Sequence, residues 1–187
     1  MRRVLVVGAG VLLIILIGIL VRSIGSIKSA EEQAADVLRQ NTAGSKGVAV
    51  EFAKKQGVEG LKPLLKSESA NVRTATIIAL GTLKGDKEAT KVLIEVVNGK
   101  DVEDAHNAII AIASQGAPET REIITKAFES PQVRRREAAC MAIYEYRDES
   151  LYPLLDVALD DKDEFIQLVA SRIKQLIRYG HSAAIDR

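Results

Sequence analysis

The side chains that most often perform catalysis are scarce in this chain. Its 187 residues include a single cysteine, Cys140, and only two histidines, His106 and His181. The histidines lack the HExxH spacing of a zinc site, and one cysteine can form neither a CxxC motif nor an internal disulfide. We therefore predict that the chain is not an enzyme and holds no metal or cofactor.

The neighbours of Cys140 and His106 indicate structural roles for both. Cys140 lies in an apolar row with helical spacing, so we interpret it as a small buried hydrophobe rather than a reactive thiol. His106 follows Glu103 and Asp104, and we expect it to be a solvated side chain on a helix. Neither residue predicts a nucleophile.

One charged cluster is not explained by helix stability. Arg134, Arg135 and Arg136 lie at the predicted start of a helix, where the helix dipole opposes each positive charge by about 0.3–1 kcal/mol. Two interpretations are open: a solvated cluster paired locally with Glu129 or Glu137, or a contact site for an acidic peptide, a phosphate group or a lipid headgroup. We expect Arg134 and Arg135 to serve binding rather than folding.

These residues lie in a chain with the periodicity of paired helices. The stretch 71–83, NVRTATIIALGTL, begins with a capping residue, Asn71, and has Val72, Ala75 and Ala79 on one helical face. Similar rows recur about every thirty residues. They are Val102, Ala105, Ile109 and Ile112, then Val133, Arg136, Cys140 and Ile143, then Ile166, Val169, Ile173 and Leu176.

The residues expected to start and end helices recur with the same repeat. Further capping residues are expected at Asp101, Ser130 and Asp161, and helix-ending glycines at Gly85, Gly116 and Gly180. Partner helices are predicted around Leu61, Leu93, Ile124 and Leu155. The pattern predicts an all-α fold, a right-handed α-solenoid of about four to five antiparallel helix pairs.

The stretch 72–81 resembles the second helix of a HEAT repeat, whose most recognisable pattern is V-R-x-A-A-x-x-A-L-G. Ala75 and Ala79 fit this pattern and Thr76 departs from it. The resemblance covers residues 58–180 and implies that the face lined by the second helices binds other proteins. The candidate contact residues are Arg73, Thr76, Glu103, His106, Arg134, Arg135 and Glu137.

The same resemblance leaves other functions open. Some HEAT-like proteins are lyases that attach bilin chromophores, and others excise bases from DNA. The chain has 26 basic and 25 acidic residues, without the basic excess of a nucleic-acid binder. We expect a protein partner, an acidic one if the arginines bind it, and no nucleic acid. Self-assembly end to end through terminal repeats is a third possibility.

The N-terminal segment predicts attachment to a membrane. Residues 4–21 contain no charged or strongly polar side chain, and 18 helical residues span about 27 Å, enough for a hydrocarbon core. Arg2 and Arg3 precede the run, which favours a cytoplasmic N-terminus with the solenoid on the opposite side. A cleaved signal peptide is the alternative.

The domain organisation follows from these segments. Residues 1–22 form the predicted single-pass anchor and 23–30 a juxtamembrane linker. Ser29 and Glu32 have the spacing of a capping box, which opens a degenerate capping helix pair over 31–57. The repeats occupy 58–180, and residues 181–187 are expected to form a tail.

Overall fold

The computed structural model describes residue 29 and residues 32–37 and 47–185, with 180–185 described by their backbone alone. The chain divides into two compact units, Met1–Gln33 and Ala34–Arg187. The apolar run at 4–21, predicted to cross a membrane, lies outside the described residues. Among the helices that are described, none is both long and apolar enough to cross a bilayer.

The described part of the first unit shows the expected helix start. The Glu32 backbone N–H donates to Ser29 Oγ at 3.2 Å, and the Ser29 N–H donates to Glu32 Oε2 at 2.8 Å. This reciprocal pair is the capping box predicted from the sequence.

The second unit is built from helices, with no strand in its described residues. They are α3 (Gly47–Leu61), α4 (Ala70–Gly81), α5 (Lys87–Val97), α6 (Val102–Gln115), α7 (Thr120–Phe128), α8 (Val133–Tyr146), α9 (Tyr152–Ala158) and α10 (Glu164–Ile185), with short 3-10 turns η1 (Lys62–Lys66) and η2 (Glu149–Leu151). Gly57 has a positive φ of 63° and kinks α3 where the first repeat was expected to begin. The all-helical prediction is confirmed for these residues.

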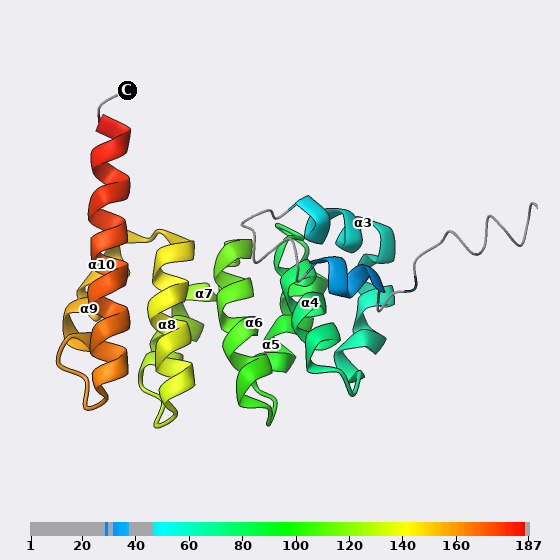
Figure 1. The fold of residues 1–187 in the computed structure, drawn as a ribbon, viewed down its shortest axis with the longest axis horizontal. Helices are drawn as coiled ribbons and strands as arrows, with labels where there is room; N and C mark the ends of the chain where they lie inside the picture. Colours follow the sequence, from blue (N-terminus) through cyan, green and yellow to red (C-terminus); the bar gives the residue numbers. More distant parts are fainter. Residues whose placement is uncertain (1–28, 30–31, 38–46, 186–187) are drawn as a thin grey trace, which may run out of the picture. The chain divides into compact units, whose positions relative to one another are not determined.

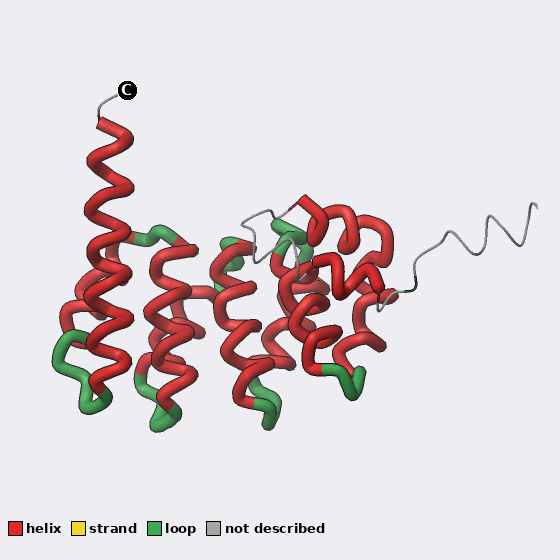
Figure 2. The backbone as a smooth tube through the Cα atoms, in the orientation of Figure 1, coloured by secondary structure: helices red, strands yellow, loops and turns green. Residues whose placement is uncertain are grey.

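The helices of this unit form two layers, as an α-solenoid requires. Figure 1 shows α4, α6, α8 and α10 side by side in one row, with α5, α7 and α9 behind them. Each helix of the front row packs against its own partner and against the next helix of the row. The tube in Figure 2 shows short loops joining successive helices. Aliphatic side chains from both layers meet in one continuous core.

Two of the predicted helix ends are confirmed. Asp101 caps α6, because its Oδ1 accepts from the N–H groups of Glu103 at 3.0 Å and Asp104 at 2.9 Å. Gly116 ends α6 in the left-handed region, with φ 72°, where glycine is tolerated without strain.

Other predicted ends were wrong. Ser69, not Asn71, caps α4 through the Val72 N–H. The residue before α8 is Gln132 rather than Ser130, and its side chain makes no capping bond. A sequence pattern locates a polar residue near a helix start, but neighbouring polar residues compete for the same orphan N–H groups.

The C-terminal helix is longer than predicted. Gly180 was expected to end it and residues 181–187 to form a tail, yet α10 continues through Gly180 to Ile185. Gly85 does not end α4 either, because α4 stops at Gly81 and Gly85 lies in the following turn with φ 75°.

The register of the first repeat also differs from the prediction. Ile77, Ile109 and Cys140 are fully buried, and each is followed by a more exposed residue and then by a buried alanine. These three residues are therefore equivalent, which confirms the predicted match of α6 to α8. The prediction aligned Ala79 of α4 with Ile109 and Cys140, but the equivalent residue is Ile77. The predicted row of α4 is therefore shifted by two residues.

The helices α4 and α6 approach each other closely at Gly81. A methyl group added there would come within 2.8 Å of Ala111 Cβ and 3.0 Å of its Cα. Backbone atoms cannot move aside as a flexible side chain can. The two helices α4 and α6 can therefore pack this closely only because Gly81 has no side chain.

We predict that Gly81→Ala destabilises the fold by about 1–3 kcal/mol, because overpacking forces the two helices apart. The control is Gly60→Ala, whose added methyl would meet only the side chain of Gln56 at 3.3 Å. It should be neutral or slightly stabilising, since alanine favours helix more than glycine. Urea unfolding measures both, and equal midpoints would contradict the close approach.

Candidate functional site

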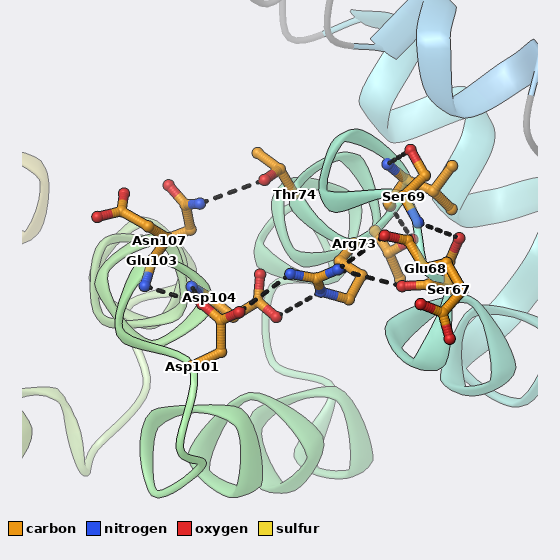
Figure 3. A network of polar contacts seen from close by, with 11 residues as sticks. Ser67, Glu68, Ser69, Arg73, Thr74, Asp101, Glu103, Asp104 and Asn107 are labelled. Atoms are coloured by element: carbon orange, nitrogen blue, oxygen red, sulfur yellow. Dashed lines mark hydrogen bonds and ion pairs between the residues drawn. The ribbon is translucent and has the colours of Figure 1, made fainter.

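Arg73 joins the first two helices of the front row (Figure 3). Its Nε donates to Asp104 Oδ2 at 2.7 Å and its Nη2 to Asp101 Oδ2 at 3.1 Å, both at the start of α6. Its Nη1 donates to the carbonyl oxygen of Ser67 at 3.1 Å, just before α4. The guanidinium group therefore holds the turn before α4 against the first turn of α6.

Arg136 repeats this geometry between α8 and the turn before α10. Its Nε and Nη2 donate to the two carboxylate oxygens of Asp161 at 2.8 and 2.9 Å. Its Nη1 donates to the carbonyl oxygens of Ser130 and Pro131 at 3.0 and 3.1 Å. The side chain is 4 % exposed, and the hydrogen bond from Arg136 is the main reason that the pKa of Asp161 lies below its ordinary value.

The junction between α6 and α8 is built differently, because alanine occupies the equivalent position, Ala105, in α6. Here the arginine comes from the later helix: Arg134 Nε donates to Glu103 Oε1 at 2.7 Å, and a second N–H contacts the other carboxylate oxygen. Arg134 also pairs with Glu137. The hydrogen bond from Arg134 lowers the pKa of Glu103.

These contacts correct the expectation for Arg134. It was predicted to serve binding rather than folding, but its guanidinium group is occupied by two carboxylates. The local pairing with Glu137 considered in the sequence is present, whereas Glu129 pairs with no side chain in the described ranges. The pairing with Glu103 was missed because it spans 31 residues.

His106 is buried and not solvated, contrary to the prediction, with 6 % of its surface exposed. Its Nε2 lies 3.7 Å from Glu137 Oε2 and has no hydrogen-bond partner among the described residues. Its Nδ1 lies 3.4 Å from Asn107 Oδ1. Burial, and next the positive charge of Arg134, lower the pKa of His106 below its ordinary value of 6.5.

Two further predicted contact residues are also buried. Thr76 is fully covered and donates from Oγ1 to the Val72 carbonyl oxygen at 2.7 Å. Glu137 lies beneath Arg134 and beside His106. Thr76, His106 and Glu137 therefore do not present a surface to a partner.

Cys140 is fully buried, as predicted. Burial raises the pKa of its thiol to about 12, so the thiolate that a nucleophile requires is not formed near neutral pH. Within the described ranges, no three His, Cys, Asp or Glu side chains converge as a metal site would require.

Arg135 differs from its two neighbours in the cluster. Its Nε donates to Gln132 Oε1 and its Nη2 to the Val97 carbonyl oxygen, both at 2.8 Å. It has no carboxylate partner in the part of the chain that is described, and its Nη1 makes no hydrogen bond there. The positive charge of Arg135 is therefore held in place but not neutralised.

Arg135 lines a groove of about 740 Å³ between α5, α7 and the start of α8. Ile94 and Val97 of α5 and Ile123 and Ala127 of α7 supply apolar lining. No pattern in the sequence predicted this groove, because its walls come from separate repeats.

Charged residues also line this groove. Glu122 and Lys126 are largely exposed and 3.7 Å apart. Glu119 and Glu129, at the two ends of α7, make no ion pair within the described residues. Apolar walls with charges of both signs are suited to non-covalent binding of a peptide segment.

Stacked antiparallel helix pairs, tied together at the ends of the front-row helices, define a helical-repeat protein. Residues 90–172 match the family of HEAT repeats, which supports placing the chain with HEAT-repeat proteins. Such repeats form scaffolds for protein interaction. No curated protein matches the chain.

The matched segment does not include α4, whose sequence resembles the HEAT pattern over residues 72–81. It does include α8, in which Arg136, Ala138, Ala139 and Ala142 follow the R-x-A-A-x-x-A part of the same pattern. The pattern is therefore carried by two helices, and in both the arginine joins a carbonyl oxygen before its own helix to carboxylates of the next repeat.

We predict that Arg136→Gln lowers stability by about 3–5 kcal/mol, because it leaves the buried Asp161 carboxylate without its charged partner. The matched control is Arg121→Gln, which removes an exposed arginine paired with Asp148 and should change little. Thermal unfolding of both variants measures the difference. A control as damaging as Arg136→Gln would contradict this assignment.

His106 predicts a pH effect of definite sign. Its pKa is lower in the fold than in the unfolded chain. The free energy of unfolding should therefore be highest above about pH 6.5 and should fall at lower pH, because acid protonates the unfolded chain first. Burial lowers the pKa of His106 most and the charge of Arg134 from α8 lowers it further, whereas Glu137 and Glu103 near the ring raise it. The lowered pKa values of Asp101, Glu103 and Asp161 act at lower pH, near their ordinary titration range.

The check is urea unfolding between pH 7.5 and 5.5 for the parent chain and for His106→Gln. The variant should show a shallower loss of stability over this range, because its amide does not titrate. Parallel curves for the two proteins would show that His106 does not contribute.

Proposed function

We propose that the chain is a membrane-tethered HEAT-repeat scaffold that binds a segment of a partner protein in the groove between α5 and α7. The observation that carries this proposal is Arg135, a fixed guanidinium group without a carboxylate partner on the wall of an apolar groove. The proposed role is binding, with no catalytic step.

The groove indicates which segment would fit. A carboxylate on the partner can accept from the free Nη1 of Arg135, and the groove already orders this side chain, so little further entropy is lost on binding. Apolar side chains of the segment would cover Ile94, Val97 and Ile123. Glu119 and Glu129 disfavour a uniformly acidic segment, because like charges repel. The proposed ligand therefore has one acidic residue among apolar ones.

The position of this groove modifies the surface inferred from the family resemblance. The expected contact residues lie along the second helices. There, Arg73 already pairs with carboxylates of the next repeat, and Arg134 pairs with Glu103 of the preceding one. The groove instead lies over the first helices and includes only Arg135 of the expected set.

We expect a photo-crosslinking amino acid at Ile123 to capture a partner in native membranes, and the same group at the exposed Lys91 not to do so. Arg135→Glu should reduce capture by roughly tenfold or more, since a charge contact becomes repulsive. Lys91→Glu makes the same change of charge outside the groove and should leave capture intact.

Thermal midpoints of both variants separate binding from folding. If a folded Arg135→Glu chain captured the partner normally, Arg135 would not be part of the binding site. If the crosslinker captured the partner equally from positions 123 and 91, the groove would not be the binding site.

The proposed tether is the apolar segment 4–21, with a cytoplasmic N-terminus and the repeats on the opposite side. The full chain should stay in membranes after a carbonate wash. Added protease should reach the repeats only after the outermost permeability barrier is opened. A soluble form that begins near Gly25 would instead establish a cleaved signal peptide, and protection that persists after opening would reverse the orientation.

A further inference from the structure

The last helix of the stack presents an apolar stripe that nothing in the described residues covers. Phe165, Leu168 and Tyr179 of α10 are 47 %, 67 % and 69 % exposed, and Val157 of α9 is 62 % exposed. The spacing of Phe165, Leu168, Arg172 and Tyr179 places them on one face of α10. We call these four residues of α10 the terminal stripe.

The length of α10 adds a second observation. It has 22 residues, against 14 in α8, and its C-terminal turns extend beyond the other helices in Figure 1. Helical turns without a packing neighbour are marginal in water. Tyr179 lies on this extension, so the terminal stripe continues beyond the last helix that could cover it within the chain.

Charge on α10 is divided between its ends. Asp163 and Glu164 lie at its N-terminal end and Arg178 lies in its second half, with Arg172 near the middle, and Glu164, Arg172 and Arg178 are exposed. Two such helices side by side would repel if parallel and attract if antiparallel, because each acidic end would then meet a basic half.

We propose that the terminal stripe binds a second copy of this chain, with the two α10 helices antiparallel and the two-fold axis close to Arg172. Phe165 and Tyr179 are each seven residues from Arg172, so Phe165 of one copy meets Tyr179 of the other. Glu164 and Arg178 flank the stripe on the same side and approach each other across the two-fold axis. The surface is thus self-complementary, as a two-fold interface must be.

The same face is less suited to an anionic lipid surface. A lipid-binding helix of this kind would carry basic residues along its whole polar edge, but Asp163 and Glu164 place negative charge at one end of the stripe. The division of charge favours a protein surface with the inverse division, which a second copy supplies.

The interface also contains one unfavourable contact. Arg172 meets its own copy near the two-fold axis, and two facing like charges weaken association. Replacing Arg172 by leucine removes this repulsion and adds apolar area, so it should tighten the dimer.

Disulfide crosslinking of the full chain in membranes tests the geometry. The single native cysteine, Cys140, is fully buried and cannot meet a cysteine of another copy, so an introduced cysteine is the reporter. Arg172→Cys should give a crosslinked dimer under mild oxidation, whereas Lys91→Cys, exposed on α5, should remain monomeric. Equal crosslinking at both positions, or none at residue 172, would overturn the proposal.

Charge reversal tests the antiparallel arrangement. Glu164→Arg and Arg178→Glu should each weaken the dimer by roughly tenfold, because two symmetric attractive contacts become repulsive. Mixing the two variants should restore association, because the altered charges are again opposite in the mixed dimer. Circular dichroism confirms that both variants fold. A mixture that associates no better than either variant alone would contradict the antiparallel pairing, and so would an Arg172→Leu chain that dimerises no more tightly than the parent.

Discussion

The contact on which this stack most depends is a guanidinium group that reaches from one repeat to the next. A helix pair in a solenoid touches only its neighbours, so the fold is only as stable as each junction. Arg73 and Arg136 each donate to carbonyl oxygens that precede their own helix and to carboxylates in the turn before, or the first turn of, the next front-row helix. One side chain thus completes two helix starts and aligns two repeats.

This constraint explains why the sequence predicted the fold better than the site. Apolar spacing, Asp101 and Gly116 are local signals, and they identified the helix pairs correctly. The partner of Arg134 is Glu103, one repeat earlier, and no local pattern distinguishes this pairing from a free charge. His106 was misjudged for a related reason: its neighbours in sequence are acidic, but Glu137 and Arg134, which lie close to its ring, belong to α8.

The groove beside Arg135 could not have been predicted from spacing at all. Its volume depends on how far α5 and α7 stand apart, and that distance follows from the packing of α6 against α8. The sequence did mark Arg135 as unusual, because an arginine in the first turn opposes the helix dipole. The cluster as a whole combined three different roles: Arg136 ties α8 to the next repeat, Arg134 ties it to the previous one, and Arg135 remains available.

The exchange of arginine for Ala105 also makes the three joints of the stack unequal. Arg136 and Asp161 are nearly enclosed by protein, and Arg73 with Asp104 is mostly so, whereas Arg134 and Glu103 meet in contact with water. Dissolved ions screen charges in water far more than charges enclosed by protein. Ionic strength therefore acts more strongly on the Arg134–Glu103 pair of the middle joint than on the Arg73–Asp104 and Arg136–Asp161 pairs of the outer two. Added salt should therefore weaken the ion pair at one of the three junctions, while the packing of α6 against α8 still holds the two repeats together there.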